Sequence, residues 1–164
     1  MLQKLPPEVL YFTSPVGELR IEIVENRVKG LKFIKGDNSP LPPLKLRGGW
    51  GSYVTTWLEN YFAGQNPAPF PWEWMDLSTG TPFQQKIWHS LWQIPQGQVI
   101  SYKELAQKAK SPQAHRAAGN ANGKNPLPIL IPCHRVIASD GKIGGYSCGV
   151  SIKKKLLKLE GHLF

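Results

Sequence analysis

The spacing of hydrophobic positions differs between the two halves of the chain. In the first half, the runs 9–13, 19–24 and 28–34 are rich in Val, Ile, Leu, Phe and Tyr. A Ser-Pro-Val-Gly turn at 14–17 separates the first two runs, and a short break at 25–26 separates the last two. This pattern predicts a small antiparallel meander of three strands.

A loop and a helix are expected to follow the meander. Residues 36–48 are rich in Gly, Pro, Asp and Asn, which favours a loop. Trp50, Val54, Trp57, Leu58 and Phe62 recur at helical spacing and predict an amphipathic helix over 51–63. Its tryptophan stripe is interpreted as core, with a binding platform as the alternative. A Pro-rich break and an aromatic patch then lead to a predicted domain boundary, giving domains 1–76 and 77–164.

Two capping boxes mark helix starts in the second half. Thr81 with Gln84 opens a helix expected to run to about Trp92, with proline at its first position. Ser101 with Glu104 opens a second helix, to about Lys108. The first should bury Phe83, Ile87 and Leu91.

A tight turn and a third helix should complete a helix-turn-helix. Ser111-Pro112 is expected to open this helix, which carries Gln113 to about Ala121 after a loop of about three residues, 109–111. A last helix is expected from about Ser151 to Gly161. Together the two halves predict an α+β protein.

Charge separates the halves as well. Residues 1–76 carry eight Lys and Arg and eight Asp and Glu, whereas residues 77–164 carry 12 and 3, so the whole net charge of +9 lies in the second half. Such an excess favours a polyanion-binding surface, with nucleic acid first and a membrane surface second.

Composition excludes other classes. Two cysteines make no disulfide framework and suit a reducing cytosol. The His and Cys residues show no metal-ligand spacing, and neither a signal segment nor a membrane-spanning stretch is found. We therefore expect an intracellular, cytoplasmic protein without metal, cofactor or membrane partner.

The most informative stretch is Ile131-Pro132-Cys133-His134-Arg135-Val136, which follows an apolar run. The thiolate is the reactive form of cysteine, and a neighbouring base or positive charge raises its population. The alternative is a small buried cysteine beside an unrelated histidine.

The second helix of the helix-turn-helix has mostly small side chains. Major-groove reading calls for long polar side chains, whereas a smooth Ala and Gly face suits close approach to a narrow groove. Arg116 is the single long side chain expected to project from this face. An Ala-rich packing helix is the alternative.

These residues resemble the O6-alkylguanine-DNA alkyltransferases, a family of DNA repair proteins. Pro132-Cys133-His134-Arg135 is similar to the family's active-site motif, and Arg116-Ala117-Ala118-Gly119 to its helix-turn-helix. Gly144-Gly145-Tyr146-Ser147 and 156–161 are similar to its binding loop and last helix. The resemblance is strong over 77–164 and weaker over 1–76. It implies a ribonuclease H-like N-terminal domain and a winged helix-turn-helix-type C-terminal domain.

The resemblance implies direct reversal of damage in double-stranded DNA by a monomer that works through the minor groove, in the cytoplasm or nucleoid of a prokaryote or the nucleus of a eukaryote. An O6-alkylated guanine, or an O4-alkylated thymine, is flipped out, and its alkyl group moves irreversibly to Cys133, in a single turnover. His134 acts through a water and is oriented by Glu160. The implied base-binding residues are Tyr102, Val136, Tyr146 and Ser147, the implied DNA-binding residues are Ser101, Arg116, Ala117, Gly119 and Arg135, and Asn125 ties the helix-turn-helix to the active-site segment.

Three positions depart from the family pattern. Cys148 stands where the family usually has glycine in the pocket loop. Three effects are open: a narrower pocket, a second thiol near Cys133, or a substitution without effect. His115 replaces a usual small residue on the recognition helix. The metal site of some relatives is not expected, because residues 1–76 contain neither Cys nor His.

Two other functions are compatible with parts of this sequence. The first is a non-catalytic lesion-binding protein of the alkyltransferase-like type, against which Cys133 argues because such relatives carry another residue there. The second is a transcription regulator, which would need further modules for which a chain ending at Phe164 has no room.

Overall fold

The computed structural model describes residues 6–35 and 49–164. The chain divides into two compact units, Met1–Asp76 and Leu77–Phe164, and each is considered by itself. The loop expected at 36–48 lies outside the described residues.

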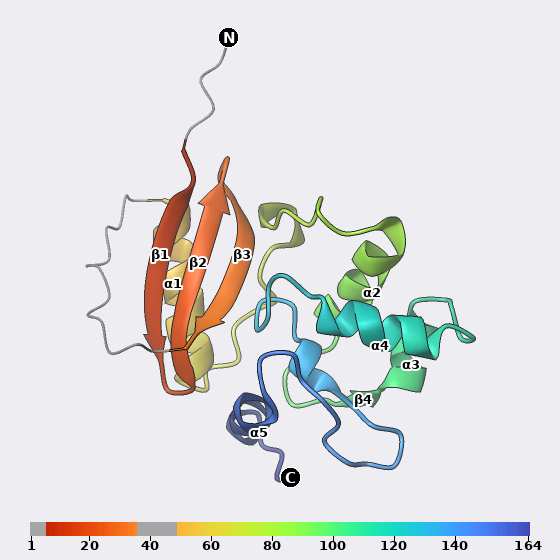
Figure 1. Ribbon diagram of the computed structural model, residues 1–164. Helices are drawn as coiled ribbons and strands as arrows, with labels where there is room; N and C mark the ends of the chain where they lie inside the picture. Colours follow the sequence, from red (N-terminus) through yellow and green to blue (C-terminus); the bar gives the residue numbers. More distant parts are fainter. Residues whose placement is uncertain (1–5, 36–48) are drawn as a thin grey trace. The chain divides into compact units, whose positions relative to one another are not determined.

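The first unit is built on the predicted meander. Strands β1 (Glu8–Ser14), β2 (Gly17–Val24) and β3 (Arg27–Ile34) form an antiparallel sheet in the order β1-β2-β3 (Figure 1). Leu10, Ile21 and Leu31 are paired across it, and none is more than 1% exposed. A buried row across three short strands with alternating burial gives this sheet its apolar face.

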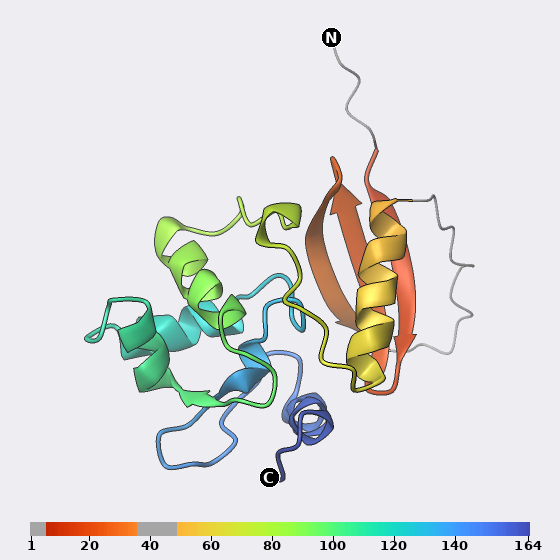
Figure 2. The same cartoon turned by 180° about the vertical axis from the view of Figure 1, so that it is seen from behind.

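Helix α1 (Trp50–Phe62) covers one face of the sheet (Figure 2). Val54, Leu58 and Tyr61 on this helix are almost fully buried. Trp57 is 9% exposed, and its indole N–H donates to the Ala68 carbonyl at 2.8 Å. Trp57 is therefore core, as predicted, whereas Trp50 at the start of the helix is only half-buried. The unit continues through the short 3₁₀ helix η1 (Trp72–Trp74).

The second unit contains the predicted helices. Helices α2 (Pro82–Trp92) and α3 (Tyr102–Lys108) both begin in complete capping boxes. Thr81 accepts from the Gln84 amide at 3.2 Å, and Ser101 accepts from the Glu104 amide at 3.1 Å. Local sequence alone supplies these bonds, which is why both starts could be predicted.

Helix α2 packs against helix α4 (His115–Gly123). The Trp88 indole N–H donates to the Ala121 carbonyl at 2.8 Å. Ile87 and Leu91 are fully buried, as predicted, whereas Phe83 is only half-buried because it lies in the exposed first turn. Gly80 is required by this packing, since a Cβ there would lie 2.2 Å from the Trp88 ring.

The start of α4 differs from the prediction. The helix begins at His115 rather than Gln113, and the connection from α3 spans 109–114. The Ala114 amide donates to the Ser111 carbonyl at 2.9 Å, which closes a turn, and the Ser111 hydroxyl bonds to Ala109 instead of capping a helix. Ser111-Pro112 therefore makes a turn before the helix.

Strands β4 (Ile100–Ser101) and β5 (Val136–Ile137) bring distant segments together. They pair in parallel, with Ile100 opposite Val136 and Ser101 opposite Ile137. The 3₁₀ helix η2 (Cys133–Arg135) directly precedes β5, so this pairing sets it beside the start of α3. Helix α5 (Val150–Leu159) follows a loop and ends at Glu160.

Within 6–35 and 49–164, no helix is both long and apolar enough to cross a membrane. The three strands of the antiparallel sheet come first in the chain, and most helices follow in separate segments. This arrangement confirms the predicted α+β class.

Candidate active site

Cys133 lies at the end of a buried segment. All residues from 127 to 136 are buried, and Cys133 is 2% exposed. The Asn125 side chain holds this segment at two points, since its Nδ2 donates to the Ile131 carbonyl at 2.7 Å and its Oδ1 accepts from the Leu127 amide at 2.9 Å. Because Asn125 closely follows α4, it links the recognition helix to the cysteine segment.

Ile129 within this segment has a φ of 75°. A β-branched residue in the left-handed region is strained, and such strain persists only where the surroundings impose it. The two bonds of Asn125 close the segment around this residue.

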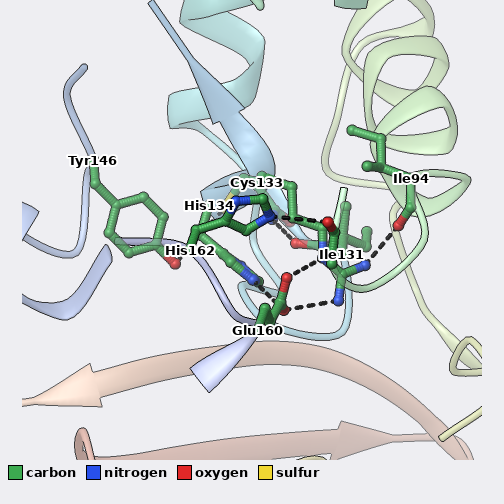
Figure 3. A network of polar contacts seen from close by, with 10 residues as sticks. Ile94, Ile131, Cys133, His134, Tyr146, Glu160 and His162 are labelled. Atoms are coloured by element: carbon green, nitrogen blue, oxygen red, sulfur yellow. Dashed lines mark hydrogen bonds and ion pairs between the residues drawn. The ribbon is translucent and has the colours of Figure 1, made fainter. Parts of the chain in front are cut away.

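The next two residues join Glu160 in a buried ionic network (Figure 3). His134 Nε2 lies 2.7 Å from Glu160 Oε1. Arg135 donates from Nε to Oε2 and from Nη2 to Oε1, both at 2.9 Å, so it grips the carboxylate with two bonds. A third bond runs from Arg135 Nη1 to the Ile94 carbonyl at 2.6 Å.

The network sets the charge of both its titratable members. Burial would raise the pKa of Glu160, but its bonds and attraction to His134 and Arg135 outweigh burial and hold that pKa well below its usual range. Burial lowers the pKa of His134, and Glu160 offsets this only in part. Glu160 is therefore ionised and His134 neutral near pH 7, with Nε2–H donated to the carboxylate and the lone pair on Nδ1.

The thiol of Cys133 is protonated at rest. Burial raises its pKa to about 11, although hydrogen bonds from Asn125 and Tyr146 act in the opposite direction. Tyr146 Oη lies 3.9 Å from Sγ and points toward it (Figure 3). The sequence predicts that a neighbouring positive charge favours the thiolate. In the structure the Arg135 guanidinium pairs with the Glu160 carboxylate instead of the Cys133 sulfur.

Arg135 is also predicted to bind DNA, but the structure gives its side chain buried partners. The residue is 7% exposed, and its bonds to Glu160 and Ile94 direct its guanidinium into the core. It therefore joins the residue that caps the last helix to η2, and its contact with DNA stays a prediction.

Lys153 is a buried residue that sequence reasoning missed. It is 0% exposed, and its Nζ donates to the Val136 carbonyl at 2.6 Å and to the Gly145 carbonyl at 2.9 Å. Burial lowers its pKa to about 8, while the charge of an ionised Cys133 would raise it. Its helical spacing from Leu156 and Leu157, on the apolar face of α5, was the signal available in the sequence.

A pocket of about 200 Å³ opens in this unit, with lining residues Tyr102, Gly119, Asn122, Gly123, Gly145, Tyr146 and Ser147. This volume is below the roughly 300–1,000 Å³ typical of drug-sized ligands and suits one small planar group. Tyr102, Tyr146 and Ser147 were predicted to bind a base, and all three line the pocket.

Val136, also predicted to bind the base, is not in this lining. It is 0% exposed, and its carbonyl is engaged by Lys153. The prediction for this residue is therefore unsupported by the geometry.

The Tyr102 ring lines the pocket and lies close to two glycines, Gly119 and Gly144. A Cβ on Gly119 would lie 3.6 Å from the ring, and one on Gly144 would lie 3.6 Å from it as well. Burial raises the pKa of Tyr102, and negative charge on Cys133 would raise it further. Gly119, expected at a DNA surface, therefore lies beside the Tyr102 ring, where a Cβ would make only an ordinary van der Waals contact.

Other predicted DNA-binding residues lie near the start of α3 and α4. Arg116 and Ala117 are exposed in the first turn of α4, beside exposed His115. Ser101 is half-buried, and its hydroxyl is engaged as the cap of α3.

Cys148 is half-buried in the loop before α5. Burial raises its pKa, while hydrogen bonds with Ser147 and Tyr146 lower it. The second thiol thus lies next to two residues of the pocket lining. Among the described residues, no group of three or more His, Cys, Asp and Glu could hold a metal ion.

Comparisons with known proteins place this chain in a family. Residues 82–162 match the model of the 6-O-methylguanine DNA methyltransferase DNA binding domain. A methylated-DNA–protein-cysteine methyltransferase of Methanosarcina barkeri is 40% identical over 156 residues, covering 90% of this chain and 92% of that protein. One of Mycobacterium leprae is 38% identical over 155 residues, covering 91% and 89%.

A solved structure is similar as well. The crystal structure of Mycobacterium tuberculosis OGT in complex with DNA superposes with a TM-score of 0.78 at 37% identity, covering 93% of this chain and 92% of that one. This likeness supports the alkyltransferase fold that the sequence resemblance implied. The chain therefore belongs to the family of methylated-DNA–protein-cysteine methyltransferases.

Proposed function

We propose that this protein repairs double-stranded DNA by moving the alkyl group of O6-alkylguanine to Sγ of Cys133, irreversibly and once per molecule. O4-alkylthymine is proposed as a second substrate. The observation that carries this proposal is a buried thiol next in sequence to a histidine whose Nε2 is held 2.7 Å from Glu160. Relatives named as methyltransferases of this type support the reaction class.

The resting charges suit a nucleophile that is activated only when needed. The Cys133 pKa of about 11 keeps the thiol neutral in the free protein. Neutral His134 has Nδ1 available to take the thiol proton through a bridging water. Glu160 would stabilise the imidazolium so formed, and Arg135 keeps Glu160 ionised for this purpose.

The transfer is a displacement at the alkyl carbon. The sulfur electron pair forms the new S–C bond, the O6–C bond breaks, and its electrons stay on the guanine. The guanine takes up one proton as it leaves, so the thiol proton ends on the base. The product is a thioether without an ionisable thiol, and the protein cannot act again.

Access to the lesion is proposed to use the recognition helix in the minor groove. The small exposed residue Ala117 and Gly119 allow α4 to approach closely, and exposed Arg116 can fill the gap that a flipped base leaves. Unstacking costs a few kcal/mol, and less for a mispaired base. The flipped base would enter the pocket beside Tyr102, Tyr146 and Ser147, with the protein acting as a monomer.

The alternative is a non-catalytic lesion-binding protein. Its DNA surface would be the same, but it would need no acceptor. The thiol of Cys133 and the network behind it favour transfer.

Mass spectrometry after reaction with a duplex holding one O6-methylguanine tests the proposal. We expect the peptide with Cys133 to gain one methyl group and the DNA to lose it. Cys133→Ala should still bind the duplex but transfer nothing, whereas Cys148→Ala, the matched control, should gain one methyl. A protein that binds the lesion while the methyl stays on the DNA would support the alternative.

A further inference from the structure

Asn122 is a buried polar residue whose side-chain oxygen has no hydrogen-bond partner within residues 6–35 and 49–164. It lies in α4, is 5% exposed, and lines the pocket with Tyr102 and Tyr146. Its Oδ1 is buried and accepts no hydrogen bond from the described part of the chain. A buried acceptor without a hydrogen bond costs free energy, so its presence at this position needs an explanation.

Packing does not provide one. Asparagine forms helices poorly, and an apolar residue of similar size would fill the position without an unmet acceptor. The side chain thus carries two structural costs, and no hydrogen bond to its Oδ1 from residues 6–35 or 49–164 offsets them, as is typical of groups kept for a ligand.

We propose that Asn122 reads the flipped base and makes the protein prefer alkylated guanine to alkylated thymine. This inference rests on the function proposed above. The amide is a paired donor and acceptor, and rotation about its last bond can turn either end to the pocket. Its oxygen accepts from the guanine 2-amino group, and its nitrogen donates to an adjoining ring nitrogen.

The chemistry of the two lesions explains the preference. Alkylation at O6 removes the N1 proton of guanine, so the 2-amino group is the only N–H donor on the base itself. Alkylation at O4 removes the N3 proton of thymine, which leaves that base with acceptors alone. An amide can make both bonds to the guanine edge but only one to thymine, just as bidentate amides distinguish bases in duplex DNA.

The test compares single-turnover transfer rates on three duplexes, containing O6-methylguanine, O6-methylhypoxanthine or O4-methylthymine. The hypoxanthine lesion lacks only the 2-amino group. Wild type should prefer guanine to hypoxanthine, and Asn122→Leu should reduce that ratio by about tenfold. Asn120→Leu is the matched control, because Asn120 is exposed on the same helix and should leave the ratio unchanged.

The outcomes separate this inference from the proposed function. A wild type that transfers from none of the duplexes refutes the proposed function. A working wild type whose guanine-to-hypoxanthine ratio survives Asn122→Leu, or a variant slowed equally on all three lesions, overturns the role of Asn122 alone. Asn122→Met serves as a second variant. If neither folds, the amide is needed by the structure, and the inference fails.

Discussion

Replacing Arg135 with methionine tests whether this arginine supports the fold or contacts DNA. The substitution keeps an apolar stem and removes the charge. It also removes two bonds to Glu160 and one to the Ile94 carbonyl. Glu160 would keep its contact with neutral His134 but would lose the buried cation that grips its carboxylate. Breaking a buried ion pair by deleting one partner costs about 3–5 kcal/mol, so we expect Arg135→Met to lower the free energy of unfolding by about 3 kcal/mol or more.

Urea denaturation measures this loss, and DNA binding at several salt concentrations measures phosphate contacts. Arg116→Met is the matched control, because Arg116 is exposed. It should change stability by less than about 0.5 kcal/mol. If it contacts a phosphate, it should reduce the slope of log K against log salt by about 0.9. Arg135→Met should leave that slope unaltered under conditions where the variant is folded.

The opposite pattern would refute this reasoning. A variant Arg135→Met with wild-type stability and a reduced salt slope would mean that the guanidinium leaves Glu160 to meet DNA. The buried network would then not be what keeps Glu160 ionised.

Three further predictions concern packing, acidity and the thiol. Gly80→Ala should destabilise the second unit by about 1–3 kcal/mol, measured by urea denaturation, because its Cβ would lie 2.2 Å from the Trp88 ring; wild-type stability would contradict the packing described for Trp88. The folded pKa values of His134 and Glu160 lie below their ordinary values of 6.5 and 4.5, so the unfolded chain binds more protons, and stability should fall as pH is lowered through 6.5 and again through 4.5. Unfolding free energies that stay constant from pH 7 to pH 4 would disprove this. Alkylation of Cys133 by iodoacetamide, followed by peptide mass spectrometry, should still accelerate up to pH 10, since its pKa is raised to about 11; a plateau near pH 9 would indicate an unperturbed thiol.

The helix starts show how much of the fold could be predicted. Thr81 and Ser101 bond to amides three residues ahead, and those bonds depend only on neighbouring residues. The predicted start of α4 is two residues early, because Ser111-Pro112 is equally compatible with a turn, and the Ala114 amide closes that turn on the Ser111 carbonyl.

Within the candidate site, residues that are adjacent in one motif could be predicted from the sequence, whereas their partners from distant segments could not. Cys133 and His134 are adjacent, and Glu160 was placed beside them only through a family resemblance. The sequence did not predict that Arg135 and Lys153 are buried. Lysine and arginine are mostly exposed, and their burial depends on partners that only the folded backbone brings near them.

By itself, the sequence determined what neighbouring residues decide: strand alternation, helix periodicity, capping and the basic second half. Tertiary structure alone decided which cations are buried, that the thiol is held neutral, and that the Asn122 oxygen is buried at the pocket with no hydrogen-bond donor among the described residues. The physical reason is that burial and pairing depend on segments far apart in the chain. Arg135 and Glu160 are 25 residues apart and meet only when α5 packs against η2.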